Sequence, residues 1–165
     1  MNKEAKLESL KKTSKVFAVI AKVMEVLSYV VAAMILLFMI LPTNIYFGIK
    51  LDEAGMIGAI WNLLQDKLDP SVSYKIFFII MIILCLIIGY VMRNTSKLFK
   101  KINKDYSPFV PENVKIIKTI AIGMAVIILI EVNLGSALVT GIAIWAVALL
   151  FDYGCELQNE SDEII

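Results

Sequence analysis

Four long apolar runs, separated by polar connections, occupy most of the 165 residues of this chain. The hydrocarbon core of a bilayer is about 30 Å thick, and a helix needs roughly 20 apolar residues to cross it, with a lower limit of about 17. Each of the four runs reaches that limit. The predicted membrane spans are residues 16–41, 76–92, 114–134 and 135–151.

The composition supports this class of protein. With 59% hydrophobic residues and a mean hydropathy of +0.81, a water-soluble chain of this length would expose more apolar surface than one core could bury. Backbone groups in lipid must be hydrogen-bonded within helices or a closed barrel, and continuous apolar runs lack the alternation of barrel strands. The sequence therefore predicts an all-α, polytopic membrane protein in which residues 1–165 form a single four-helix domain. The first run is too long for a signal peptide and no small-residue cleavage site follows it, so we expect it to remain as an anchor.

The positive charges are unevenly distributed along the chain. Most of the 16 Lys and Arg residues fall before or early in the first span, or between the second span and the first turns of the third. Lys and Arg are retained on the cytoplasmic side of a membrane, so both chain termini, the basic loop 93–113 and the acidic tail 152–165 are predicted to be cytoplasmic. The expected location is the cell membrane, with multiple passes. The basic residues of the two regions are Lys3, Lys6, Lys11, Lys12, Lys15 and Lys22, then Arg93, Lys97, Lys100, Lys101, Lys104, Lys115 and Lys118.

The outer segment between the first two spans has a helical pattern of its own. Pro42 closes the first span, and apolar residues then recur at spacings of three and four until Asp69 and Pro70 end the pattern. This pattern predicts a short interfacial helix that lies flat on the outer surface, with Trp61 at the depth of the lipid headgroups. The alternative is a lid over an outward cavity. The apolar positions are Met56, Ile57, Ile60, Trp61, Leu64 and Leu68.

The loop between the second and third spans is rich in lysine. Leu98, Phe99 and Ile102 would share one side of a short basic helix, which we expect to lie on anionic lipid of the inner leaflet. Pro111 followed by Glu112 predicts the start of the third helix, because proline suits the first turn and an acidic residue suits the positive end of the helix dipole. Close flanking by two spans favours lipid over nucleic acid as the reason for the basic residues, so no direct nucleic-acid binding is expected.

The first span contains a group of polar residues. Lys22, Glu25 and Tyr29 fall on one face of a helix, where the opposite charges can meet. One interpretation is a polar pocket that faces the other helices. The other is an ion pair near the membrane interface, which can reach water by extending its side chains.

The third and fourth spans are joined by a connection so short that they must pack as an antiparallel hairpin. Small residues four positions apart allow helices to approach closely, and three such pairs occur here. Helix packing explains these pairs, and small residues on further faces leave a homo-oligomer open. The pairs are Ala121 with Ala125, Ser136 with Thr140, and Ala137 with Gly141.

Several classes of catalytic site are excluded by the residues present. The chain has no histidine, which removes His-based metal sites, Ser-His and Cys-His nucleophile pairs and the H-E-x-x-H motif. Cys85 and Cys155 match no metal motif and should lie at different depths, so no disulfide is expected between them. With no acid-base or metal constellation in view, we expect no enzyme activity, catalytic residue, metal or cofactor.

Two polar motifs resemble a known family. The stretch SPFVPENV before the third span, together with the terminal FDYGCELQNESDE, is similar to the small bacterial four-span membrane proteins grouped as domain of unknown function 2975. That family usually has Phe-Thr-Pro-Glu-Asn and then Gly-x-x-Leu-Gln-x-x-x-Asp at these places. Val110 departs from the pattern, because valine has no side-chain acceptor to cap the helix. The matching residues are Phe109, Pro111, Glu112, Asn113, Gly154, Leu157, Gln158 and Asp162.

The resemblance implies a context, since members of this family are often encoded beside a small helix-turn-helix regulator and have no assigned enzymatic activity. The first expected function is therefore regulatory or scaffolding: the chain would hold a cytoplasmic partner, such as that regulator, at the membrane. The second is a small transporter or channel subunit with a path near Lys22, Glu25 and Tyr29. The candidate partner-binding residues are the matching residues of the two motifs together with Glu156 and Glu160, which a helical tail would align along one face with Glu163.

Overall fold

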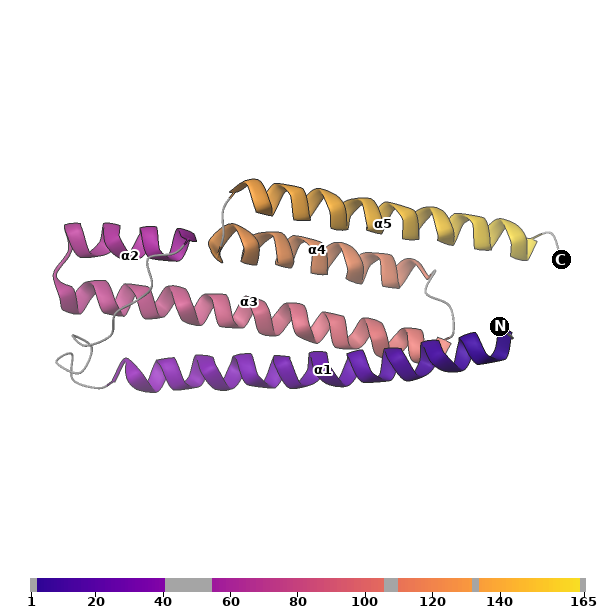
Figure 1. The fold of residues 1–165 in the computed structure, drawn as a ribbon, viewed down its shortest axis with the longest axis horizontal. Helices are drawn as coiled ribbons and strands as arrows, with labels where there is room; N and C mark the ends of the chain where they lie inside the picture. Colours follow the sequence, from indigo (N-terminus) through magenta and orange to yellow (C-terminus); the bar gives the residue numbers. More distant parts are fainter. Residues whose placement is uncertain (1–2, 41–54, 106–109, 132–133, 164–165) are drawn as a thin grey trace.

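The computed structural model describes residues 3–40, 55–105, 110–131 and 134–163, and these ranges form five helices and no strand (Figure 1). The helices are α1 (Lys3–Phe38), α2 (Gly55–Lys67), α3 (Pro70–Asp105), α4 (Pro111–Glu131) and α5 (Leu134–Glu163). All except α2 contain a stretch that is long and apolar enough to cross a membrane. The predicted all-α, four-span class is confirmed, as is the start of a helix at Pro111. Pro42 lies outside the described residues. The four stretches are Lys11–Phe38, Pro70–Lys104, Pro111–Ile130 and Gly135–Gln158.

The four long helices form an open row. Among the described residues, α1 packs on α3, α3 on α4 and α4 on α5, so that α1 and α5 are the two edges of the row (Figure 1). A water-soluble protein would have to close such a row to cover its apolar side chains, whereas in a membrane lipid can cover them. The N-terminal end of α1 and the C-terminal end of α5 lie at the same end of the row, which we call the terminal end (Figure 1).

The contact between α1 and α3 follows a seam of small and polar residues on α1. Buried positions recur at alternating spacings of four and three, which is the pattern of a coiled coil, and small side chains allow the two backbones to approach closely. Ser96 of α3 uses this proximity, because its Oγ donates a hydrogen bond to the backbone oxygen of Ala18, at 2.9 Å. The outward side of α1 is exposed and apolar, as a lipid-facing surface requires. The seam consists of Ser14, Ala18, Ala21, Glu25, Ser28 and Ala32.

The short helix α2 exists as predicted, but its Trp61 side chain faces the protein and not the lipid headgroups. α2 folds back along the first turns of α3 (Figure 1), and Trp61 is only 5% exposed because it packs against Tyr74 and Phe77, with ring centroids 4.8 and 5.1 Å away. The reversal is held by Ser73, whose buried Oγ lies 2.9 Å from the backbone oxygen of Leu64 in α2. Aromatic packing on α3 therefore replaces the expected contact of Trp61 with headgroups.

The expected short basic helix on the inner leaflet is also wrong. α3 is one continuous helix of 36 residues, about 54 Å long at 1.5 Å per residue, so it extends well beyond a hydrocarbon core of about 30 Å. The three apolar residues assigned to the inner leaflet pack within the protein instead. Leu98 is buried against Ile117 and Ala148, Ile102 packs on that cluster, and the Phe99 ring stacks on Phe17 of α1. Tertiary contacts thus carry the helix through most of the predicted loop.

The helices α4 and α5 form the predicted antiparallel hairpin. A Cβ added at Gly141 would meet the Cβ of Ala125 at 3.5 Å, an ordinary contact, so the expected close packing of small residues is found. α5 does not end at the membrane boundary predicted near Phe151 but continues to Glu163, which makes most of the acidic tail helical. Cys85 on α3 and Cys155 on α5 are both free thiols.

Candidate functional site

The polar group of the first span centres on Glu25. Its side chain is 7% exposed because it belongs to the seam between α1 and α3, while the side chain of Lys22, at the edge of the seam, is 52% exposed. The Lys22 Nζ lies 2.8 Å from the Glu25 Oε2. The carboxylate is thus held inside the protein by a lysine that also reaches the surroundings, so the group combines the two interpretations made from the sequence.

Tyr29 lies one turn further along α1 and covers a gap in α3. A Cβ added at Gly89 would stand 2.6 Å from the Tyr29 Cε1 and 3.1 Å from the Ser28 Oγ, so the absence of a side chain at Gly89 makes room for both. The Ser28 hydroxyl is within hydrogen-bonding distance of the backbone oxygens of Met24 and Glu25, at 3.0 and 2.9 Å. The polar atoms near Glu25 are therefore engaged within α1 itself.

At the terminal end, ion pairs join neighbouring helices of the row. Lys101 of α3 pairs with Glu112 of α4, and Lys118 of α4 pairs with Asp152 of α5, where Nζ and Oδ2 are 3.0 Å apart. Beneath them, the cluster of Leu98, Ile117 and Ala148 packs α3, α4 and α5 together. The last turns of α3 and α5 and the first turns of α4 therefore form one continuous surface.

The first predicted motif forms the start of α4. The backbone oxygen of Val110 accepts hydrogen bonds from the N–H groups of Asn113 and Val114, at 2.8 and 3.3 Å, so Val110 occupies the capping position through its backbone alone. Pro111 and Glu112 are exposed, whereas Asn113 is only 1% exposed. Asn113 therefore serves the packing of α4, and Phe109 lies outside the described residues.

The second predicted motif lies on the last turns of α5. Glu156, Leu157 and Glu160 are exposed, and Gly154 and Gln158 are partly buried. Asp162 also lies in this helix. Because α4 and α5 are antiparallel and Lys118 pairs with Asp152, the start of α4 lies beside the turns of α5 that follow Asp152. The two motifs, which are distant in sequence, thus meet at the terminal end.

A groove runs between α4 and α5, and the sequence did not predict it. It has a volume of about 450 Å³, an almost entirely apolar lining, and Trp145 and Leu149 toward one end. The Lys118 Nζ lies 5.9 Å from the centre of the Trp145 ring, so the pair of Lys118 and Asp152 stands next to that end. The signal was available: folding the hairpin about residues 132–133 brings Lys118 opposite about Val147, between Trp145 and Asp152. The lining residues are Ala125, Ala137, Leu138, Gly141, Ile142, Trp145, Ala146 and Leu149.

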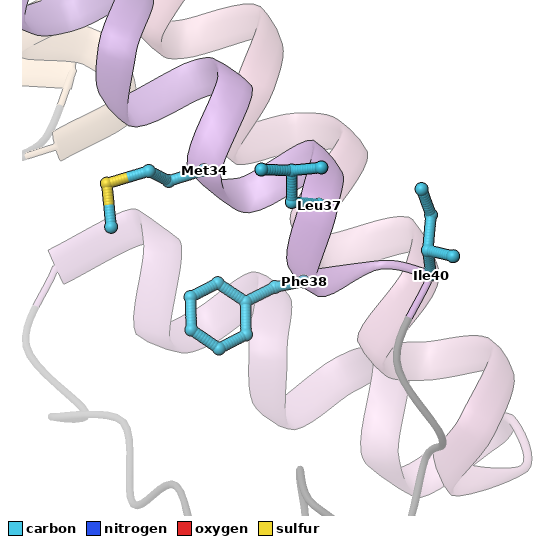
Figure 2. A pocket seen from close by; sticks show the side chains of 4 residues that line it. All are labelled: Met34, Leu37, Phe38 and Ile40. Atoms are coloured by element: carbon cyan, nitrogen blue, oxygen red, sulfur yellow. The ribbon is translucent and has the colours of Figure 1, made fainter.

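A second cavity, of about 420 Å³, lies at the far end of α1. Figure 2 shows that Met34 and Phe38 reach toward one side of the helix, with Leu37 and Ile40 nearby. These described lining residues are all apolar, so they offer no group for acid-base chemistry or ion binding. Within the described ranges, no three side chains of the metal-binding types gather at one place.

No family model, curated protein or solved structure matches this chain.

Proposed function

We propose that this chain is a non-enzymatic, multi-pass protein of the bacterial cell membrane that holds a basic cytoplasmic partner at its terminal end. We also propose that the chain belongs to the family that the two motifs resemble, and that the partner is a small helix-turn-helix regulator. Proteins that bind DNA carry a positive surface, which would complement an acidic site on a membrane protein.

The proposed orientation follows from where the basic residues lie. Lys12 and Lys15 on α1, and Lys97, Lys100 and Lys104 on α3, are exposed near the terminal end. Lysines in these positions favour retention of that end in the cytoplasm. A soluble cytoplasmic partner would then reach the end of α5, which α4 separates from the lysines of α1 and α3.

The observation that carries the proposal is an exposed face on the last turns of α5. Tyr153, Glu156, Leu157 and Glu160 follow one another at helical spacing, and all four are exposed. Such a face offers two negative charges beside two apolar side chains. It suits a partner helix with lysines or arginines around an apolar strip, in the manner of a helix that docks on another helix.

The charges on this face are available, whereas those beside it are engaged. Asp152 and Glu112 form ion pairs with lysines of the same chain. Among the described residues, no lysine or arginine pairs with Glu156 or Glu160. An acidic side chain that is exposed and lacks an internal ion pair can steer and bind a basic partner at little desolvation cost.

The test is capture of the regulator encoded beside this chain by the full protein in mild detergent. We expect the double variant Glu156→Gln with Glu160→Gln to weaken binding by about tenfold or more, since each charge-assisted contact contributes about 1.5 kcal/mol. The matched control is Asp66→Asn with Asp69→Asn, which removes two exposed acids near the opposite end of α3. Unchanged binding by the first variant would refute the assigned surface.

The transporter function remains as a second candidate, because Glu25 is a buried carboxylate in a membrane span. Ionisable residues inside membranes are costly and commonly mark ion pathways. In liposomes, Glu25→Gln should abolish any proton or cation flux through such a path. Flux that is absent from the native protein, or unaltered by the variant, would remove this candidate.

A further inference from the structure

The ion pair of Lys118 and Asp152 stands at the terminal end of the groove between α4 and α5. Asp152 lies one turn beyond Leu149 on the face of α5 that lines the groove, and Lys118 lies two turns before Ala125 on the corresponding face of α4. The two side chains meet across the groove at the terminal end. The residues that line the groove itself are all apolar or small.

The dimensions of the groove match one leaflet of a bilayer. From Ala137 to Leu149 the helix rises about 18 Å, at 1.5 Å per residue. Half of a hydrocarbon core is about 15 Å. The apolar part of the groove is therefore long enough for a lipid acyl chain. The headgroup of a lipid whose chain lay along the groove would fall beside Lys118 and Asp152.

Lys118 and Asp152 can each form further hydrogen bonds. An ammonium group has three donors and a carboxylate accepts about four hydrogen bonds, and the pair uses only one of these interactions. The side chains of Lys118 and Asp152 are 33% and 48% exposed, so a second molecule can reach them. Two exposed residues of opposite charge flank this pair. They are Lys115, one turn before Lys118, and Glu156, one turn after Asp152, so the net charge around the pair stays near zero.

We propose that this groove binds a phospholipid with a primary-amine headgroup, namely phosphatidylethanolamine. The phosphate contacts Lys118, the ammonium group contacts Asp152, and one acyl chain lies against Gly141 and Ala146. The phosphate and the ammonium group of the lipid thus lie antiparallel to the pair of Lys118 and Asp152. Each of the four charges then has two neighbours of opposite sign.

The same chemistry disfavours the other common headgroups. An anionic glycerol headgroup would bring its phosphate to Lys118 but leave Asp152 facing a negative charge, which is the repulsion that creates specificity. A choline headgroup has no N–H to donate to the carboxylate. Its quaternary ammonium would favour an aromatic ring, but Lys118 already lies over the Trp145 ring.

The experiment is native mass spectrometry of the full chain in mild detergent, titrated with phosphatidylethanolamine, phosphatidylcholine or phosphatidylglycerol of identical acyl chains. We expect phosphatidylethanolamine to bind about tenfold more tightly than either competitor, as one extra charge-assisted hydrogen bond predicts. Lys118→Gln and Asp152→Asn should each abolish this preference. The matched control is Lys101→Gln, which removes an ion pair between α3 and α4 away from the groove, and the preference should survive it.

Two further variants test the acyl-chain site separately from the charges. Ala146→Phe places a ring in the groove and should weaken the binding of all three lipids, whereas Ala143→Phe adds the same ring at an exposed position of α5 that does not line the groove. Equal affinities for the three lipids in the native protein would overturn the proposal, as would a preference for phosphatidylglycerol. Loss of binding to the regulator leaves these affinities unaffected, so the two proposals fail independently.

Discussion

Gly123 of α4 receives the side chain of Val91 from α3. A Cβ added at Gly123 would overlap the Val91 Cγ2, and Val91 is only 1% exposed, with a β-branched side chain that has little freedom to turn away. Val91 also belongs to the central apolar cluster with Leu84 and Ile127. The spacing between α3 and α4 therefore depends on a missing side chain.

Gly123→Ala should destabilise the protein by about 1–3 kcal/mol, the usual cost of overpacking a well-filled contact. The measurement is thermal unfolding in detergent. Gly141→Ala is the control, because its new Cβ would stand at an ordinary 3.5 Å from Ala125 and should leave the melting temperature unchanged or raised. Combining Gly123→Ala with Val91→Ala should recover part of the loss. Equal melting temperatures for Gly123→Ala and Gly141→Ala would contradict this prediction, because they would show that the Val91 side chain moves aside at little energetic cost.

Ser96 links α3 to α1 through its hydrogen bond to the Ala18 oxygen. Ser96→Ala should cost only about 0.6 kcal/mol, the average for such bonds between membrane helices, because the Ala18 oxygen retains its partner within α1. Ser96→Leu should cost far more, since a large side chain separates two helices packed through small residues. Thermal unfolding of both variants checks the order. Thr119→Ala, whose hydroxyl bonds within α4, is the control for losing a hydroxyl. A greater loss for Ser96→Ala than for Ser96→Leu would contradict close packing of the seam.

The number and class of the helices were predictable, because apolar length and lipid thickness alone decide them. The start of α4 was predictable as well, since Pro111 and Glu112 signal it locally. The positions of Trp61 and Leu98 were not, because each depends on a neighbour that comes from another helix. An amphipathic pattern shows that a face must be covered, but it does not say whether lipid or protein covers it.

In the candidate sites, too, contacts within one helix were easier to predict than contacts between helices. The sequence could place Lys22 beside Glu25, because that contact lies within one helix. The contact of Lys118 with Asp152 joins two helices, so it could be predicted only by folding the hairpin of α4 and α5 about its short connection. The acidic residues of the tail were expected along one helix face, and the structure adds which of them are already engaged.

The ion pair of Lys22 and Glu25 should respond unequally to loss of either partner. Lys22→Met leaves a carboxylate inside the seam without its partner and should cost about 3 kcal/mol, the lower end for breaking a buried pair. Glu25→Gln leaves a half-exposed lysine that can extend to the interface, so it should cost less than about 1 kcal/mol. The double variant should regain most of the stability lost by Lys22→Met. Thermal unfolding at constant salt measures all three, and equal losses for the two single variants would mean that Glu25 is not buried.

The hairpin of α2 and α3 should open without unfolding the row of spans. Trp61 is the residue of α2 that inserts between Tyr74 and Phe77, and replacing a buried tryptophan by alanine typically costs 3–5 kcal/mol. That cost falls on one short helix, which packs on α3 and on the end of α4 without forming part of the row itself. In Trp61→Ala we therefore expect faster amide hydrogen exchange across residues 55–67, with exchange in α1 and α5 unaltered. Leu63→Ala changes an exposed position of the same helix and should leave its exchange as in the native protein. If Trp61→Ala accelerated exchange throughout the spans, α2 would be part of the cooperative unit that holds the row together.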